Sequence, residues 1–265
     1  MLSVIGISYG DQWLTKEAIK AIAEAETVIG YQGFIDEVSH ITKDDVVAFD
    51  VLDDIREGEN FLIARVRRAV DAVNEGRKTV ILSNGDVNIF GMSGAVHREL
   101  NRIERQDLVK QTKVITGISA FQIAAAHLGG PLSNGFATLA LCIAEVPHAA
   151  VERKIAGAAQ GDFVTVVYML RHNAENFPDL HPEITNPKEI SSQRQLKMIN
   201  KFAEYREPHT PCVIATNIGR DDQSMHHSPL SDLPNHLDKM TANSILFVGA
   251  SDTIVFDNIL VSPTW

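Results

Sequence analysis

Residues 79–94 read TVILSNGDVNIFGMSG, an apolar run rich in β-branched residues that ends abruptly in small and polar ones. Runs of this kind alternate along the chain with longer stretches in which apolar residues recur at helical spacing. Such alternation is typical of βα units and a parallel sheet. The strands predicted in the first half are Ser3–Ile7, Thr27–Ile29, Asp45–Ala48, Thr79–Leu82 and Lys113–Ile115. We therefore expect an α/β fold.

The clearest break in this pattern is the Gly-Gly-Pro at residues 129–131, because glycine and proline end regular elements. We expect a first domain over residues 1–117 and a second over residues 118–265. The strands predicted in the second half are Ala137–Leu141, Phe163–Tyr168, Cys212–Thr216, Ser244–Val248 and Thr253–Val261. The last two are joined only by Gly249–Asp252, which favours a hairpin. Arg171–Ser192 is polar, contains prolines and lacks periodicity, so it is predicted to be a long loop.

The composition argues against several classes of protein. The chain has 265 residues, of which 45% are hydrophobic, and a formal net charge of −10. This charge disfavours nucleic acid as a partner, since phosphate binding needs a clustered positive surface. The two cysteines, Cys142 and Cys212, cannot build a disulfide framework. No apolar run reaches the ~18 residues of a membrane span, and no signal core follows the N-terminus. We expect a cytoplasmic protein without membrane or nucleic-acid partners.

Three strand-to-loop junctions are candidate ligand sites, because ligands of open α/β sheets bind beyond the carboxyl ends of the strands. The first junction is residues 6–11, Gly-Ile-Ser-Tyr-Gly-Asp, whose glycines permit a tight turn and whose Asp11 supplies a carboxylate. It lacks the spacing of a dinucleotide-binding motif. On spacing alone, a plain strand-to-helix turn explains it.

The second junction is residues 83–94, where backbone amides and Asp86 lie directly after an apolar strand. A carboxylate there could accept hydrogen bonds from a ribose or hold an ammonium or sulfonium group. A simple turn with glycines that ease helix packing explains the same residues equally well. The third junction is residues 116–120, in which Ser119 is predicted to cap a helix whose free amides could meet a ligand carboxylate.

The remaining candidates are weak. His226 and His227 lie in the irregular stretch Asp221–Asn235, and with His236 they could suggest a metal site, but no paired carboxylate or cysteine spacing supports one. The chain has no phosphate-binding loop, nucleophile elbow or H-E-x-x-H motif. The residues themselves indicate an α/β protein of two domains that binds a small ligand, and no metal, at glycine-rich junctions.

Taken in order, the junctions resemble the motifs of the tetrapyrrole methyltransferase family, whose members use S-adenosylmethionine. Residues 4–15, VIGISYGDQWLT, are similar to the family's V-G-I-G-P-G-D-x-x-L-T, and residues 24–31, EAETVIGY, to its E-A-D-V-V-V-G-Y. Residues 83–94 are similar to S-S-G-D-P-G-I-Y-G-M-A-G, and residues 116–128, TGISAFQIAAAHL, to P-G-I-S-A-F-Q-A-A-A-A-R-L. The most similar branch is that of the precorrin-3B C17-methyltransferases of cobalamin biosynthesis.

The resemblance implies a two-domain class III S-adenosylmethionine methyltransferase fold, with a mixed, mostly parallel sheet in each domain, and methyl transfer to a carbon atom. It places the cofactor between the domains and implies a homodimer. The residues expected to bind the cofactor are Gly85, Asp86, Ile89, Phe90, Ser119, Ala120, Met169, Thr216 and Asn217. Ser8, Arg171 and His172 are expected to meet the substrate, the last two by pairing with its carboxylates. Asp11 or Tyr9 is expected to act as the base.

The chain also departs from the family pattern. Ser8 and Tyr9 replace a glycine and a proline in the first loop, and Val87 replaces a proline in the second. Tyr168-Met169 stands where the C17 branch has L-Y-N-P-R-S, and is instead similar to branches in which the methionine packs against the cofactor. A corrinoid and a non-corrinoid substrate, such as an indole, a peptide or another small heterocycle, therefore both remain open. A non-catalytic binding protein on the same fold is a third alternative, which loss of cofactor binding would favour.

Overall fold

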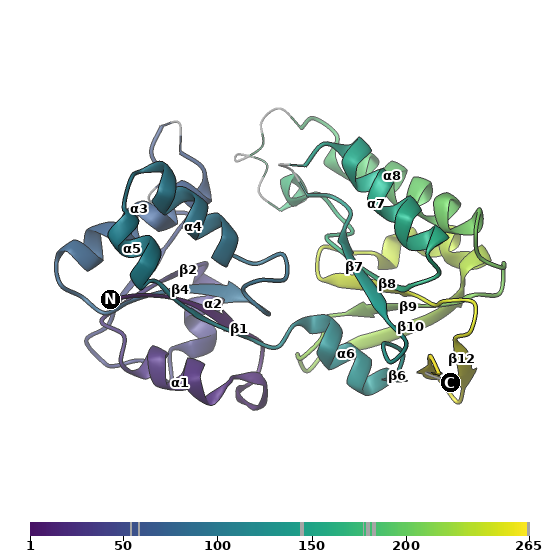
Figure 1. Cartoon of the computed structure of the whole chain (residues 1–265), viewed down its shortest axis with the longest axis horizontal. Coiled ribbons are helices and arrows are strands. Elements are labelled where there is room, and N and C mark those ends of the chain that lie inside the picture. Colours follow the sequence, from purple (N-terminus) through teal and green to yellow (C-terminus); the bar gives the residue numbers. More distant parts are fainter. Residues whose placement is uncertain are drawn as a thin grey trace. The chain divides into compact units, whose positions relative to one another are not determined.

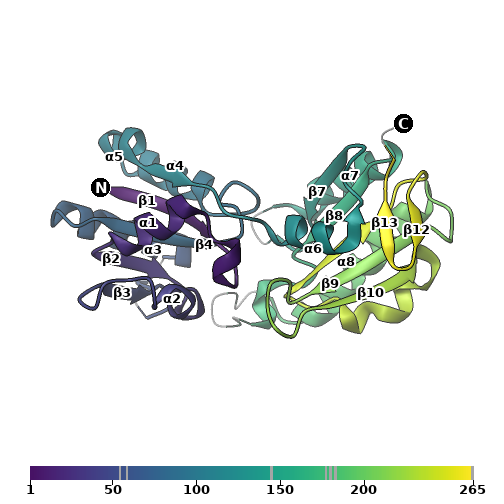
Figure 2. The ribbon, with the colours of Figure 1, turned by 90° about the horizontal axis from the view of Figure 1, so that it is seen from below.

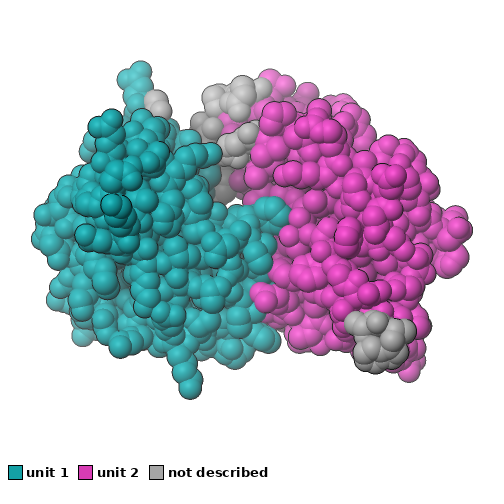
Figure 3. Space-filling model, viewed as in Figure 1, with its two compact units in different colours: residues 1–120 teal, residues 121–265 magenta. Residues whose placement is uncertain are grey.

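The computed structural model describes residues 1–53, 55–57, 59–143, 146–176, 178, 181 and 184–263. The chain forms two compact units, Met1–Ala120 and Phe121–Trp265, which Figure 3 colours separately. The predicted domain boundary after Gly117 lies shortly before the end of unit 1. None of the helices in the described ranges is long and apolar enough to cross a membrane.

The described part of unit 1 is built on a parallel sheet of five strands. The strands are β1 (Leu2–Ile7), β2 (Thr27–Gly30), β3 (Val47–Asp50), β4 (Thr79–Asn84) and β5 (Lys113–Ile115), in the order β3-β2-β4-β1-β5. Every strand predicted in this half of the chain is therefore present. β1 is buried along its whole length, which explains why it reads as a continuous apolar run, since both faces of the sheet are covered.

Helices lie on both faces of this sheet (Figure 1). They are α1 (Lys16–Ala23) and α2 (Gln32–Val38) on one face, and α3 (Phe61–Asn74), α4 (Ser93–Arg102) and α5 (Gln106–Gln111) on the other. Ile5 and Ile7 of β1 pack in the core of the first group, whereas Leu2 and Val4 pack in the core of the second. This division follows from the alternation of side chains along a strand.

The chain leaves the neighbouring strands β1 and β4 toward opposite faces of the sheet. Residues 8–15 lead from β1 to α1, which begins after Thr15, whose Oγ1 accepts the N–H of Ala18 at 3.1 Å. Residues 85–92 lead from β4 to α4 on the other face. Such a divergence is the topological switch point at which α/β sheets bind ligands. The first two predicted ligand loops flank it.

The described part of unit 2 contains a second sheet of five strands, in the order β10-β9-β11-β8-β7. Its strands are β7 (Phe136–Ala140), β8 (Val164–Tyr168), β9 (Pro211–Thr216), β10 (Ser224–Pro229) and β11 (Ser244–Val248). Its helical elements are α6 (Ala120–Leu128), which begins at the end of unit 1, α7 (His148–Gln160), η2 (Asn173–Glu175), α8 (Pro187–Ala203) and η4 (Leu230–Lys239). One core joins α7, α8 and η4 to the sheet.

The sheet of unit 2 is mixed, as expected, but it is not mostly parallel. β7 and β8 form its parallel pair, whereas β11 runs antiparallel to both β8 and β9, and β10 antiparallel to β9. The reason lies in the path of the chain. β7, β8 and β9 run in one direction, linked through α7 and α8 in βα fashion, and β11 then enters between β8 and β9 from the opposite end.

The predicted C-terminal hairpin is wrong in its pairing. β11 pairs with β8 and β9, and not with the segment that follows it. β12 (Ile254–Phe256) and β13 (Ile259–Val261) pair with each other instead, and β13 also pairs with β6 (Gly129–Gly130) in a small separate sheet (Figure 2). The turn residues Asp257 and Asn258 both have positive φ, 48° and 64°, as tight hairpin turns require.

Two stretches expected to be irregular contain regular structure. The residues of β10, within Asp221–Asn235, form an edge strand that pairs with β9. Arg171–Ser192 contains η2 and the beginning of α8, which starts at Pro187, a residue suited to the first helical position. Residues 177, 179, 180, 182 and 183 of the predicted loop lie outside the described residues.

Candidate functional site

The loops after β1, β4 and β5 are held together through three glycines. A Cβ on Gly6 or on Gly117 would collide with the carbonyl oxygen of Gly85. The Gly85 N–H donates to the carbonyl of Ile7 at 2.6 Å, and the Gly85 φ of 67° lies in the left-handed region that favours glycine. The glycines singled out in the sequence therefore allow close approach of one backbone to another. They bring all three predicted ligand junctions into one assembly within unit 1.

Asp86 ties two of these loops together. Its side chain accepts hydrogen bonds from the N–H of Asn88 at 2.8 Å, the N–H of Gly117 at 3.3 Å and the hydroxyl of Thr116. Its own N–H donates to Oγ of Ser119 at 3.2 Å, and the residue is only 7% exposed. The Asp86 carboxylate therefore links the loops after β4 and β5, and does not project as a free acceptor toward a ribose or a sulfonium group.

Phe90 is the exposed aromatic residue among the cofactor candidates of unit 1. Its side chain is 38% exposed, and its φ of 55° is uncommon for a residue other than glycine. Backbone conformations of this kind cluster at ligand-binding loops. Ile89, in the same loop, and Ala120, at the start of α6, are half-buried. A ring held in a fixed loop offers a flat apolar surface to a ligand ring.

The cofactor candidates of unit 2 also lie at the ends of strands. Met169 follows β8 with a φ of 51°, and Asn217 follows β9 with a φ of 53°. The Asn217 amide nitrogen donates to Asp222 at 2.8 Å, but its Oδ1 is buried and accepts no hydrogen bond within the described residues. Oγ1 of Thr216 lies 2.8 Å from Oγ of Ser244. Asn217 thus keeps an unused acceptor at a loop where the family resemblance expects a ligand.

The two candidate bases lie in the loop after β1. This loop is held by α2 and by the turn that follows α2. Asp11 is exposed, and its two carboxylate oxygens are 2.9 and 3.1 Å from Nε2 of His40. The N–H of Gly10 donates to the carboxylate of Glu37 at 2.7 Å. Tyr9 is half-buried. His40 gives Asp11 an imidazole partner that the sequence did not reveal, because no motif includes it.

Most departures from the family pattern point into the protein. Ser8 is buried and donates to the carbonyl of Ile118 at 2.5 Å, and Val87 has no exposed surface. The hydroxyl of Tyr168 accepts the N–H of Phe121 at 2.9 Å. These three side chains therefore stabilise the loops. Of the departures, Tyr9 and Met169 remain as residues able to change what the loops bind.

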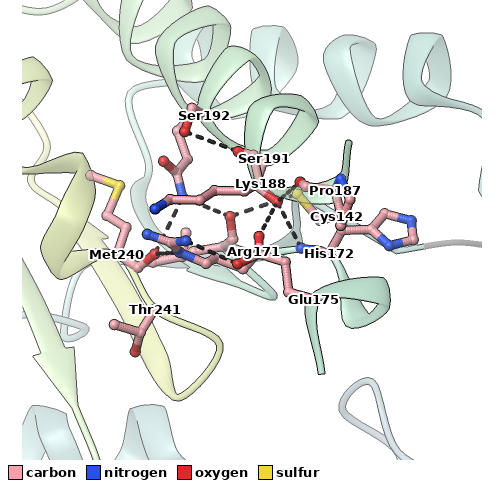
Figure 4. A network of polar contacts seen from close by, with 12 residues as sticks. Cys142, Arg171, His172, Glu175, Pro187, Lys188, Ser191, Ser192, Met240 and Thr241 are labelled. Carbon is pink, nitrogen blue, oxygen red and sulfur yellow. Dashed lines mark hydrogen bonds and ion pairs between the residues drawn. The ribbon is translucent and has the colours of Figure 1, made fainter. Parts of the chain in front are cut away.

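Arg171 and His172 are engaged inside unit 2 (Figure 4). Nε of Arg171 donates to the carbonyl of Met240 at 2.7 Å, and Nη1 pairs with Glu175 at 2.9 Å. His172 is 3% exposed. Its main-chain N–H donates to Oγ of Ser191 at 2.9 Å, and its ring Nδ1 accepts the N–H of Ala174 at 3.1 Å. Ser191 in turn donates to Glu175 at 2.9 Å. This network fixes the chain after β8 against α8, and it occupies the groups expected to meet substrate carboxylates.

The cysteines and the histidine pair of β10 and η4 offer no further chemistry at these loops. Burial raises the pKa of the Cys142 thiol to about 11, and it also raises the pKa of Cys212. The His226 and His236 rings are 4.3 Å apart, and His236 lies 3.0 Å from Asp232. In the residues that the structure describes, no group of three or more His, Cys, Asp or Glu side chains is arranged to hold a metal ion.

Comparison with known proteins decides the family. The profile described as Tetrapyrrole (Corrin/Porphyrin) Methylases matches residues 1–234. The chain belongs to the tetrapyrrole methylase family. This membership confirms the methyltransferase class expected from the sequence.

Several relatives are similar along nearly the whole chain. A probable cobalt-factor III C(17)-methyltransferase of Salmonella typhimurium is 29% identical over 265 residues, which cover 99% of this chain and 98% of that protein. A cobalt-factor III methyltransferase of Priestia megaterium is 27% identical, over 99% of this chain but only 44% of that longer protein. Among these relatives the chain therefore matches both a protein of its own length and a part of a longer one.

Solved structures confirm the fold class. The methyltransferase CobJ matches with a TM-score of 0.83 and 22% identity over 99% of both chains. The cobalt precorrin-4 methyltransferase CbiF matches with a TM-score of 0.68 and 18% identity over 94% of both chains. The α/β architecture of two units is thus the fold of these methyltransferases.

Proposed function

We propose that this chain is an S-adenosylmethionine-dependent C-methyltransferase that methylates a corrinoid at carbon 17 during cobalamin biosynthesis. The observation that carries this proposal is similarity along nearly the whole chain to proteins of that name. Besides the Salmonella protein, a probable cobalt-factor III C(17)-methyltransferase of Methanocaldococcus jannaschii is 25% identical over 99% of this chain and 96% of its own. We further propose that the protein is a cytoplasmic homodimer, which the family resemblance supports.

The strand-end loops supply groups that fit this cofactor. The buried Oδ1 of Asn217, which lacks a donor among the described residues, suits an amino group such as that of adenine. The exposed ring of Phe90 suits the apolar face of a purine. We propose that these two residues contact the cofactor, together with the other candidates of the two units. These are Gly85, Ile89, Ser119, Ala120, Met169 and Thr216, with Asp86 holding the loop in shape.

The bound cofactor supplies an electrophilic methyl group. The task of the protein in such a transfer is to align the nucleophilic carbon with that group and to accept any released proton. In our proposal Asp11 accepts the proton, and His40, 2.9 Å from its carboxylate, holds the carboxylate in place. Tyr9 lies two residues before Asp11 and faces the substrate. Ser8 contributes by fixing the loop through its bond to Ile118.

Ser8 and Val87 are compatible with a corrinoid substrate, whereas Tyr9 could favour a different one. Ser8 and Val87, which differ from the family pattern, are buried and do not alter the surface offered to a substrate. Tyr9 does differ on a half-buried position of the loop, and it would carry a change of specificity toward a smaller heterocycle.

Calorimetric titration with S-adenosylhomocysteine tests the cofactor site. We expect the wild-type protein to bind, and Phe90→Ala to weaken binding roughly tenfold, since stacking on an aromatic side chain contributes about 1–3 kcal/mol per base. Phe163→Ala is the matched control, because Phe163 is a similarly exposed phenylalanine, 44% exposed, next to β8. A wild-type protein that does not bind would favour a non-catalytic binding protein.

Methyl transfer from isotope-labelled S-adenosylmethionine to cobalt-factor III tests the substrate. We expect one labelled methyl group in the corrinoid, bonded to carbon 17 as located by NMR. A protein that binds the cofactor but methylates an indole or a peptide, and no corrinoid, would contradict the corrinoid assignment while leaving the enzyme class intact.

A further inference from the structure

Arg65 is a buried arginine whose charge the described residues do not neutralise. It lies in the second turn of α3 and is 2% exposed. Its guanidinium lies over the ring of Tyr31, 4.4 Å from the centroid, and near Phe61 at 5.5 Å. Nη1 donates to the sulfur of Met92 at 3.0 Å, a weak acceptor. Nε and Nη2 are buried, and neither has a hydrogen-bond partner among the described residues.

The vacant pair of nitrogens is the pair that other arginines of this chain use to bind a carboxylate. Nε and Nη2 of Arg67 hold both oxygens of Glu59 at 2.8 and 3.0 Å. Nε and Nη2 of Arg102 hold those of Glu99 at 2.8 and 2.7 Å. This bidentate geometry matches the two oxygens of a planar carboxylate. In Arg65 the same two nitrogens, Nε and Nη2, have no acceptor in the described part of the chain.

Among the described residues, no carboxylate forms an ion pair with Arg65. Burial lowers the pKa of Arg65, while the charges of Tyr31 and Asp50 and a hydrogen bond with Tyr31 oppose that shift. Asp50 forms no ion pair with Arg65, and one of its oxygens accepts the N–H of Leu52 at 3.0 Å. By contrast, the buried Arg206 pairs with Asp162 at 3.0 Å and donates to main-chain carbonyls. A guanidinium stays charged when buried, and a buried charge without a partner is costly.

The residues around Arg65 lie at one edge of the sheet of unit 1. Tyr31 directly follows β2, Asp50 ends β3, and Met92 ends the loop after β4. Each of these residues therefore lies at the carboxyl edge of the sheet of unit 1. This is the edge at which α/β sheets bind ligands, and it also carries the loop of Asp11 and the loop of Phe90.

We propose that Arg65 recognises a carboxylate of a ligand, which enters when the ring of Tyr31 moves off the guanidinium. Tyr31 is half-buried, so part of the residue is open to solvent. The inference rests on the proposed function for the source of the carboxylate. A corrinoid of this pathway carries ionised acetate and propionate side chains, and S-adenosylmethionine carries the carboxylate of its methionine part. The recognised group is the same in both cases.

The test compares Arg65→Met with Arg68→Met. Arg68 is the matched control, since it lies on the same helix and its guanidinium stacks on Phe49, 4.7 Å from the ring centroid. The corrinoid probes are cobyrinic acid, with free carboxylates, and cobinamide, whose side chains are amides on the same ring. The cofactor probes are S-adenosylhomocysteine and 5′-methylthioadenosine, which lacks the carboxylate. Each is titrated by calorimetry into the full-length protein.

We expect Arg65→Met to weaken cobyrinic acid binding by about tenfold or more, as loss of a charged hydrogen-bonded pair does. The affinity of Arg65→Met for cobinamide should stay that of the wild type, and Arg68→Met should bind every probe as the wild type does. Loss of S-adenosylhomocysteine binding instead, with 5′-methylthioadenosine unaffected, would assign the carboxylate to the cofactor. Arg65→Met should also keep or raise the melting temperature, because an apolar side chain replaces an unpaired buried charge. A merely structural arginine would lower it.

Arg65→Lys provides a second variant that keeps the charge and loses the bidentate geometry. It should bind cobyrinic acid more weakly than wild type even if Arg65→Met does not fold. Wild-type affinities in both Arg65 variants would overturn the recognition role and leave the proposed function standing. A wild-type protein that binds neither corrinoid nor S-adenosylhomocysteine would overturn both.

Discussion

Replacing Asp86 with alanine should destabilise unit 1 by about 3 kcal/mol, although Asp86 lies in a loop expected to bind the cofactor. The estimate follows from three donors, the N–H groups of Asn88 and Gly117 and the hydroxyl of Thr116, that lose a buried acceptor. A buried donor left without a partner costs about 1–3 kcal/mol. The total stays near the low end because the Gly117 bond is long, at 3.3 Å.

Urea denaturation followed by circular dichroism measures this loss, with Asp36→Ala as the control on an exposed residue of the same unit. Asp86→Asn keeps one acceptor oxygen and should fall between wild type and Asp86→Ala. Cofactor binding measured at low temperature and without urea separates a loss of stability from the loss of a contact between Asp86 and the cofactor. If Asp86→Ala unfolds like wild type yet fails to bind S-adenosylhomocysteine, the carboxylate contacts the ligand directly, and the reasoning from its three hydrogen bonds is refuted.

Three further results are expected. Gly117→Ala should lower the stability of unit 1 by about 3 kcal/mol in the same urea assay, the upper end of the usual cost of overpacking a core, because its Cβ would meet the backbone of the neighbouring loops. Wild-type stability would mean that these loops separate readily. Burial lowers the pKa values of His226 and His227 below 6.5, so the unfolded chain takes up protons first and unit 2 should lose stability as the pH falls below about 6.5, whereas a melting temperature that is flat from pH 7 to 5 would contradict this. The raised pKa values of Cys142 and Cys212 predict that neither thiol reacts with Ellman's reagent at pH 8 until the protein unfolds, so rapid labelling of the native protein would show that one of them is accessible.

The strands of unit 1 could be predicted from the sequence because their signal is local. β1 is buried on both faces, so its residues had to form a continuous apolar run, and the helices that cover it had to alternate with it along the chain. The partner of β11 could not be predicted in this way. Its residues are apolar wherever the strand is placed, and only the fold puts it between β8 and β9 rather than beside the segment that follows.

The candidate site shows the same division. The glycines of the three loops could be found because close backbone approach leaves no other choice of residue. The roles of Asp86 and Arg171 could not, since a carboxylate or a guanidinium serves a ligand and a neighbouring loop with the same chemistry. Arg65 and His40 belong to no sequence motif, because the roles proposed for them depend on the residues that lie next to them in space.

The position of β11 between β8 and β9 has a consequence for folding during synthesis. Ser244–Val248 follows both β8 and β9 in the sequence, yet it lies between them in the sheet and pairs with each. During synthesis β8 and β9 both emerge before Ser244–Val248, so one edge of each strand stays open until that segment has left the ribosome. Open strand edges invite pairing with other chains, so this interval is the vulnerable one for aggregation. Chaperone capture of nascent chains that stop short of residue 244 should therefore be stronger than capture of chains that extend past residue 248.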